Sequence, residues 1–242
     1  VGMIPLAFLG WYAADKATDA LMDKSYAQLE SVRDIKKDAV ASFFQTIHNQ
    51  ILTFSEDKMV VDAMRDLKWA FSSYSSERAL DASKLAGMKK ELAAYYTNDF
   101  TNEYKSQNKG DVPDVQKLLD MLDEDAIALQ HQYIKANKHP LGSKHLLDSA
   151  GDSSGYSAIH ADIHPIIRDY LEKFGYYDIF LVDAESGDIV YSVFKELDYS
   201  TSLKDGPYSG TNFGEAFRLA SQAKHDHDVF LVDYKPYFPS YE

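Results

Sequence analysis

His160 and His164, two histidines four residues apart, have a spacing that suits metal binding. Side chains at positions i and i+4 lie on one face of a helix, where two imidazoles can bind one zinc ion. The residues between them, Ala-Asp-Ile, lack the glutamate that an HExxH hydrolase uses as its general base. Pro165 follows directly and disturbs a helix, because proline has no backbone N–H. We therefore predict that both histidines form hydrogen bonds or cap a helix and bind no metal.

Other arrangements that could carry catalysis are weak or missing. His225 and His227 lie in a polar stretch that is typical of a solvated loop. No serine lies in a GxSxG motif, and no glycine-rich phosphate loop occurs. Cysteine is absent, which excludes disulfides, thiol catalysis and cysteine-ligated zinc. We predict a protein that is not an enzyme, with no catalytic residues and no cofactor.

Tyrosines and charged residues concentrate instead between residues 176 and 208. Tyrosine combines a large apolar ring with a hydrogen-bonding hydroxyl, which suits a cleft for a small polar ligand. Lys195 could pair with a ligand carboxylate and Asp198 with an amine, and the sequence does not decide between them. The alternative is that most of these tyrosines are half-buried packing residues. The candidate ligand-binding residues are Tyr177, Tyr191, Lys195, Asp198, Tyr199 and Tyr208.

The element that must position these residues is a predicted β-hairpin at residues 175–195. Its two runs of β-branched and aromatic residues, 178–183 and 188–195, are joined by Ala-Glu-Ser-Gly. Such runs around a short connection are typical of antiparallel strands. Tyr191 and Lys195 have the same strand parity, so both side chains should point to the same side of the sheet.

Almost everything before the hairpin is predicted to be helical. Lys16 to Met64 contains no proline or glycine, and its apolar residues recur at steps of three or four. We predict one continuous amphipathic helix there, with Phe43, Ile47 and Phe54 turned toward other helices or the sheet. At 1.5 Å per residue, ~45 helical residues reach roughly 70 Å, as in a stalk that becomes the spine of a domain. The alternative is one arm of a helical bundle.

The rest of the chain is predicted to be helices, loops and one more strand. Pro165 should either kink its helix or start a new one. Asn212 and Glu215 form an expected N-cap pair after the loop at residues 196–210. Residues 228–234 are predicted to form a third strand, and we expect the sheet to be incomplete and the natural protein to continue. Further helices are predicted over residues 60–74, 81–100, 113–137 and 156–174.

The composition fits a folded protein without a nucleic-acid partner. The 242 residues are enough for one large or two modest domains, and 45% of them are hydrophobic. The formal net charge is −13, from 38 acidic and 25 basic residues. Affinity for nucleic acids comes mainly from Lys and Arg contacts to phosphates, so this balance argues against such a partner.

The first 14 residues, VGMIPLAFLGWYAA, are apolar, and charged residues begin at Asp15. A helix that spans a bilayer needs about 20 apolar residues, so this run is shorter than a full span. Trp11 and Tyr12 lie where the aromatic residues of a membrane interface are expected. We predict that residues 1–14 are the outer end of a transmembrane helix. The alternative is an apolar helix packed inside a soluble domain.

The pattern resembles the extracytoplasmic sensor domains of the Cache (PDC) type, which occur in bacterial chemoreceptors and sensor kinases. The matching features are the apolar N-terminal end, the helix LESVRDIKKDAVASFFQTIHNQIL and the strand-turn-strand YDIFLVDAESGDIVYS. Residues 141–208 are also similar to a block of methyl-accepting chemotaxis proteins and some membrane nucleotide cyclases. The resemblance covers residues 141–242 well and 1–66 loosely. Amine- and amino-acid-sensing members carry Arg-x-Trp-Tyr after the hairpin. Here that place is Lys-Asp-Gly-Pro-Tyr208, which keeps only the tyrosine and leaves the ligand open.

The resemblance implies an α+β fold in which a long N-terminal spine helix and a helical region precede a Cache-like antiparallel sheet. The expected regions are a membrane-helix end at 1–14, a helical spine and helical region at 15–150, and a truncated sensor region at 151–242. The implied function is ligand sensing in a transmembrane chemoreceptor of the inner membrane, with this region in the periplasm. Small-molecule binding would be relayed through the long helix to a cytoplasmic signalling module.

The implied partners are a small polar ligand, the membrane through the N-terminal segment, and a second copy of the chain in a homodimer. Three other functions stay open. One is the sensor region of a membrane histidine kinase or nucleotide cyclase, which the missing signalling module would identify. Another is a metal-dependent hydrolase that uses the two histidines, and the last is a helical scaffold without a ligand.

Overall fold

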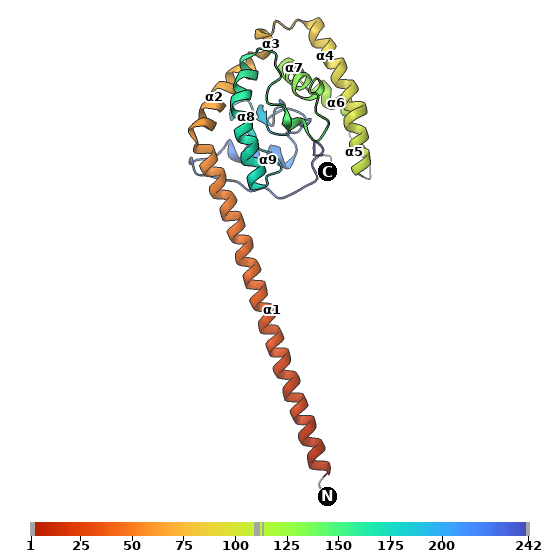
Figure 1. The fold of residues 1–242 in the computed structure, drawn as a ribbon, viewed down its shortest axis with the longest axis vertical. Helices are drawn as coiled ribbons and strands as arrows, with labels where there is room; N and C mark the ends of the chain where they lie inside the picture. The colour runs from red at the N-terminus through yellow and green to blue at the C-terminus, as the bar shows by residue number, and fades with distance from the viewer. Residues whose placement is uncertain (1–2, 109–111, 113, 241–242) are drawn as a thin grey trace. The chain divides into compact units, whose positions relative to one another are not determined.

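The computed structural model describes residues 3–108, 112 and 114–240. Helices make up 64% of it, and a small two-stranded antiparallel sheet completes a mixed α+β fold (Figure 1). The chain divides into two compact units, residues 1–54 and residues 55–242. The predicted helix start at Pro113 lies outside the described residues, as do the ends of the regions 1–14 and 151–242.

The first unit is formed by one helix, α1 (Met3–Glu56), which is continuous over 54 residues. The prediction of an unbroken helix is confirmed through Glu56 but wrong beyond it. The side chain of Asp57 accepts a hydrogen bond from the Met59 backbone and caps a new helix there. The expectation that Phe43 packs against other elements is also wrong, because Phe43 is 61% exposed. Among the described residues, no helix combines the length and the apolar character that a bilayer span requires.

The second unit begins with helices whose starts are fixed by capping side chains. Asp81, Asp114 and Asp123 each accept hydrogen bonds from backbone N–H groups of the following turn. The elements are α2 (Lys58–Ser72), α3 (Tyr74–Glu77), α4 (Ala82–Ala94), α5 (Thr101–Gln107), α6 (Val115–Asp120) and α7 (Glu124–Gln130). A π-helical segment (Tyr95–Phe100) joins α4 to α5, and a second one (His131–Lys135) and a 3-10 turn (Lys144–Leu146) follow α7.

The helix α8 (Gly155–Phe174) runs through Pro165 without a new start. Ser154 caps its first turn, and Gly175 ends it in the left-handed conformation that glycine adopts without strain. α8 packs beside α2 (Figure 1). Its buried face follows the helical period and consists of Tyr156, Ser157, His160, Ile163, His164, Ile167 and Leu171.

The predicted hairpin is present, with shorter strands than expected. β1 (Phe180–Val182) and β2 (Ile189–Ser192) pair antiparallel, with Leu181 opposite Tyr191, and β2 is buried throughout. β2 ends before Lys195, which has a positive φ of 57°, so strand parity does not orient that side chain. The turn needs Gly187, because a Cβ there would lie 2.7 Å from Cβ of Lys204.

Two predictions about the C-terminal part are wrong. The cap of α9 (Asn212–Ala220) is Thr211, whose hydroxyl accepts from the Gly214 N–H, whereas Asn212 donates to the Asp233 carbonyl. Residues 228–234 form no strand, and Leu231 and Tyr234 in it are 75% and 84% exposed. A strand is stable only beside another strand, and no described residues pair with this segment.

Candidate functional site

Five of the six predicted ligand-binding residues are buried, and they fall into two neighbouring groups. Tyr177 is the exception, with 48% of its surface exposed. One group lies between α8 and β2, and we call it the histidine–tyrosine cluster. Its members are Tyr133, Tyr156, His160, His164, Tyr191, Lys195 and Tyr199, all at most 1% exposed.

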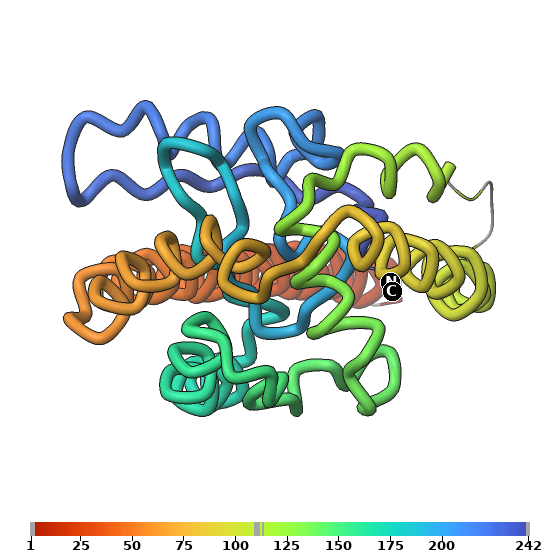
Figure 2. Tube along the Cα trace, turned by 90° about the horizontal axis from the view of Figure 1, so that it is seen from above, coloured from red at the N-terminus to blue at the C-terminus, as the bar shows by residue number. Residues whose placement is uncertain are grey.

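Tyr133 joins this cluster from the segment that runs beside α8. The segment at residues 131–150 and α8 lie side by side (Figure 2), and the Tyr133 hydroxyl is 2.9 Å from Oγ of Ser157. The hydroxyl of Tyr199 donates to that of Tyr156 at 2.8 Å, which in turn donates to the Val190 carbonyl at 2.7 Å. The hydroxyls of these three tyrosines therefore have protein partners, as expected of packing residues.

His164 is neutral and hydrogen-bonded at both ring nitrogens. Its Nε2 lies 2.7 Å from the His145 carbonyl, which only accepts, so Nε2 carries the proton. Its Nδ1 then accepts from the Tyr191 hydroxyl, also at 2.7 Å. Burial, aided by the charge of Lys195, lowers the pKa of His164 to about 2.

His160 stacks on His164, with ring centres 4.4 Å apart, and differs in one respect. Its Nδ1 lies 2.6 Å from the Asp148 carbonyl and must donate to it, while its Nε2 has no hydrogen-bond partner. Burial followed by the charge of Lys195 holds its pKa well below the usual value. Among the described residues, no group of three or more His, Asp or Glu is arranged to hold a metal ion. The absence of metal stays a prediction, although neither nitrogen of His164 is available as a ligand.

Lys195 is turned into the protein and away from solvent. Its Nζ donates to the carbonyls of Ser192 and Val193 at 3.1 and 3.0 Å. It also lies 5.4 Å from the ring centre of Tyr191 and 5.9 Å from that of Tyr133. Burial keeps the pKa of this amine well below its ordinary value. With these contacts made inside the protein, Lys195 fits a structural role better than the predicted pairing with a ligand carboxylate.

The second group, which we call the carboxyl cluster, consists of Asp178, Glu196, Asp198, Tyr208 and Tyr237. Asp198 is fully buried, and its Oδ2 accepts from the Tyr237 hydroxyl at 2.9 Å. Its other oxygen, Oδ1, is buried and has no hydrogen-bond partner. The hydroxyl of Tyr208, a residue that is 3% exposed, also lacks a partner. Burial raises the pKa of Asp198 to about 6.

The other two carboxyls belong to partly buried residues. Glu196 accepts from the Tyr177 hydroxyl at 2.8 Å and from Oγ of Ser240 at 3.4 Å. Burial, and then the negative charge of Asp198, raises its pKa to about 9. Asp178 accepts from the backbone N–H groups of three residues, 179, 193 and 194, and burial followed by the charge of Asp198 raises its pKa to about 7. In the described part of the chain, no lysine or arginine forms an ion pair with any of the three.

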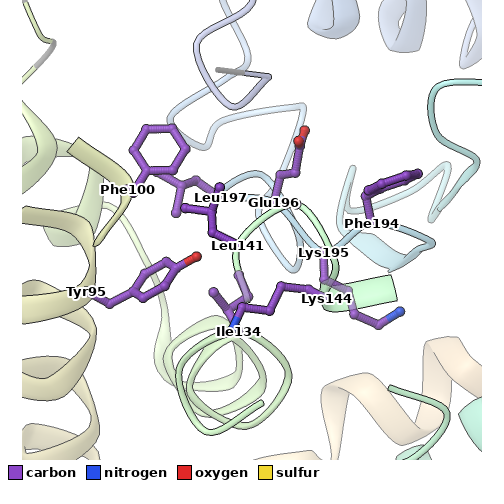
Figure 3. Close-up of a pocket in the computed structure, with 10 residues that line it drawn as sticks. Tyr95, Phe100, Ile134, Leu141, Lys144, Phe194, Lys195, Glu196 and Leu197 are labelled. Atoms are coloured by element: carbon purple, nitrogen blue, oxygen red, sulfur yellow. The ribbon is translucent and has the colours of Figure 1, made fainter. Parts of the chain in front are cut away.

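Two kinds of space adjoin the carboxyl cluster. A small cavity beside Lys195 and Glu196, also lined by Tyr95, has a volume of about 10 Å³, which holds about one water molecule. In Figure 3 the hydroxyl of Tyr95 is turned toward Leu141, and the carboxyl of Glu196 is turned away from Tyr95. Tyr237 borders a larger, open hollow of about 530 Å³ between the start of α9 and residues 232–237. This volume lies within the range of pockets for small molecules.

Three members of the carboxyl cluster, Asp178, Glu196 and Tyr237, are absent from the six predicted ligand-binding residues. Glu196 is the first residue of the predicted loop, so the density of acids after the hairpin was a usable signal for it. Tyr237 lies 39 residues beyond its partner Asp198, and no local pattern connects the two.

Comparisons with known proteins assign no family to these residues. No protein-family model matches the chain, and no curated protein and no solved structure gives a significant match.

Proposed function

We propose that the chain is a ligand-sensing domain of a transmembrane chemoreceptor, of the extracytoplasmic Cache type, and that the carboxyl cluster is its ligand site. The observation that carries the proposal is a group of three buried, unpartnered polar atoms in the loop after the hairpin. They are Oδ1 of Asp198, Oγ of Ser200 and the hydroxyl of Tyr208. Buried polar atoms almost always have a partner, and leaving one without costs about 1–3 kcal/mol. A ligand that supplies the missing contacts would recover that free energy.

The hydrogen-bond partners of the six predicted residues narrow the choice of ligand contacts. In the histidine–tyrosine cluster the hydroxyls of Tyr191 and Tyr199 already have protein partners, so a ligand would have to displace them. In the carboxyl cluster the free oxygens have nothing to displace. Of the six residues predicted from the sequence, Asp198 and Tyr208 are therefore the ligand contacts that we retain.

A route from solvent to Asp198 passes Tyr237. Its hydroxyl binds Oδ2 of Asp198, and the same residue lines the open hollow of about 530 Å³. Rotation of this one side chain would open the buried carboxyl to the hollow. Small ligands commonly enter through side chains that move in this way, on a timescale much faster than signalling.

The contacts of α2 inside the second unit would allow a change at the hairpin to reach α2. α2 packs against both α8 and β2, and Lys68 of α2 binds the carboxylates of Asp183 and Glu185 at the hairpin turn. Only Asp57 separates α2 from α1 along the chain. Ligand binding shifts such a system only if the ligand prefers one of two conformations. The proposal places the domain in the periplasm, with residues 1–14 at the inner membrane and a second copy as partner. The same domain would serve a histidine kinase or a nucleotide cyclase equally well.

A thermal-shift screen of small acids, amines and sugars tests the proposal. We expect at least one compound to raise Tm of the wild type, and to lose that effect in Asp198→Asn. Asp162→Asn, on the exposed face of α8, is the matched control and should respond like the wild type. The proposed site is wrong if the active compound stabilises Asp198→Asn equally, and the proposed sensing role is wrong if no compound binds.

A further inference from the structure

No lysine or arginine among the described residues forms an ion pair with a carboxyl group of the carboxyl cluster. Asp178 is stabilised by backbone N–H groups and Glu196 by two hydroxyls, whereas Asp198 receives one hydroxyl. Lys195, a nearby amine, points to the carbonyls of Ser192 and Val193 instead. A buried carboxylate without a positive partner is unfavourable, and proteins avoid it by protonation or by binding a cation.

Tyr237 connects Asp198 and Tyr208. The ring of Tyr208 packs edge to face on that of Tyr237, with centres 5.8 Å apart, and Tyr237 binds the other oxygen of Asp198. Asp198, Tyr208 and Tyr237 therefore form one contiguous group that combines a carboxylate with two aromatic rings, both of which can attract a cation.

We propose that this region binds one compact monovalent cation, held by Oδ1 of Asp198 and the hydroxyl of Tyr208. The inference rests on the proposed function, because it names the chemical class that the same site takes. Two kinds of occupant share the required chemistry, a single small positive charge: a primary ammonium group and an alkali-metal ion.

The size and charge of the occupant follow from the site. Asp198 is 0% exposed, and Tyr237, which binds its Oδ2, also lines the open hollow, so a bulky cation does not fit unless Tyr237 moves. Oδ1 of Asp198 accepts and never donates when ionised, so an anion has no favourable contact there. A divalent ion needs more anionic ligands, and no suitable group of three occurs among the described residues.

Salt titrations of the purified protein test the proposal. At pH 8 and constant chloride concentration, choline chloride is replaced stepwise by ammonium, methylammonium, potassium or sodium chloride. Choline supplies the same ionic strength but is too large for the closed site. We expect at least one compact cation to raise Tm above its value in choline. A response to ammonium and methylammonium alone assigns an amine, and a response to potassium or sodium assigns an alkali ion.

Variants then assign the response to the site. Asp198→Asn removes the charge at nearly constant shape and should weaken the effective cation at least tenfold, about 1.4 kcal/mol. Tyr208→Phe removes only the hydroxyl and should weaken binding of the effective cation severalfold. This variant tests the site if Asp198→Asn does not fold. Asp162→Asn should behave like the wild type.

Two results would overturn the cation site. One is equal Tm in all five salts, and the other is a cation response that persists in both variants. The failure of this inference is distinguishable from that of the proposed function. Suppose that an uncharged compound stabilises the wild type but not Asp198→Asn, and that no compact cation raises Tm. The proposed sensor site then stands, and the proposed cation site is wrong.

Discussion

Replacing Glu196 with glutamine should flatten the pH dependence of the protein's stability. Burial, followed by the negative charge of Asp198, raises the pKa of Glu196 from 4.5 to about 9. The unfolded chain has the ordinary value, so between the two values the folded protein keeps a proton that the unfolded chain releases. The protonated carboxyl therefore contributes stability that is complete below pH 4.5 and is lost as the pH rises toward 9.

The size of this effect follows from the width of that window. One fully shifted group removes up to about 1.4 kcal/mol of unfolding free energy per pH unit. From pH 5 to pH 7 the wild type should lose about 2–3 kcal/mol that Glu196→Gln does not lose. Asp178 and Asp198, with pKa values raised to about 7 and about 6, titrate in both proteins and largely cancel in the comparison.

Urea denaturation followed by circular dichroism at pH 5, 6, 7 and 8 measures this difference. The matched control is Glu124→Gln, an exposed residue in the first turn of α7, whose stability should follow the wild type at every pH. Parallel pH profiles for the wild type and Glu196→Gln would refute the reasoning. They would mean that Glu196 is ionised in the fold and that its burial is less complete than the structure indicates.

Three further predictions test the assignment of packing and binding roles. Tyr191→Ala should lower the unfolding free energy by about 3–5 kcal/mol, because Tyr191 is 0% exposed. Urea denaturation measures this loss, and the same measurement on Tyr191→Phe distinguishes the contribution of the ring from that of the hydroxyl. Phe43→Ala should change the unfolding free energy by less than about 0.5 kcal/mol, because Phe43 is 61% exposed. Leu92→Ala is the contrasting variant and should lower it by about 2–5 kcal/mol in the same assay, because Leu92 is 0% exposed. Elemental analysis of purified protein should find no stoichiometric zinc, and zinc that is lost in His160→Ala would revive the hydrolase hypothesis.

The elements that local chemistry determines were predictable from the sequence. The hairpin follows from two runs of β-branched residues around a short turn, and α1 follows from a long stretch without proline or glycine. The end of α1 was missed because its signal is a single capping residue, Asp57, inside a sequence that otherwise favours helix. Pro165 was expected either to kink its helix or to start a new one, and α8 continues through it without a new start.

The candidate site was predictable only in part, because its contacts join distant segments. The density of tyrosines and acids identified the loop after the hairpin, and Asp198 and Tyr208 lie in it. Residue type did not separate Tyr191, whose hydroxyl binds His164, from Tyr208, whose hydroxyl has no partner. That distinction depends on which atoms the fold brings together. The same holds for Tyr237, which reaches Asp198 from far along the chain.

The position of Asp198 connects the proposed site to the elements that could respond to a ligand. Asp198 directly precedes Tyr199, whose hydroxyl donates to that of Tyr156 on α8, which donates to the Val190 carbonyl in β2. A change in the charge of Asp198 therefore acts on a loop that is hydrogen-bonded to both α8 and the sheet. α2 packs against these same two elements, and its Lys68 holds the hairpin turn through Asp183. Contact alone is not coupling, which requires a second arrangement of these elements that the ligand prefers.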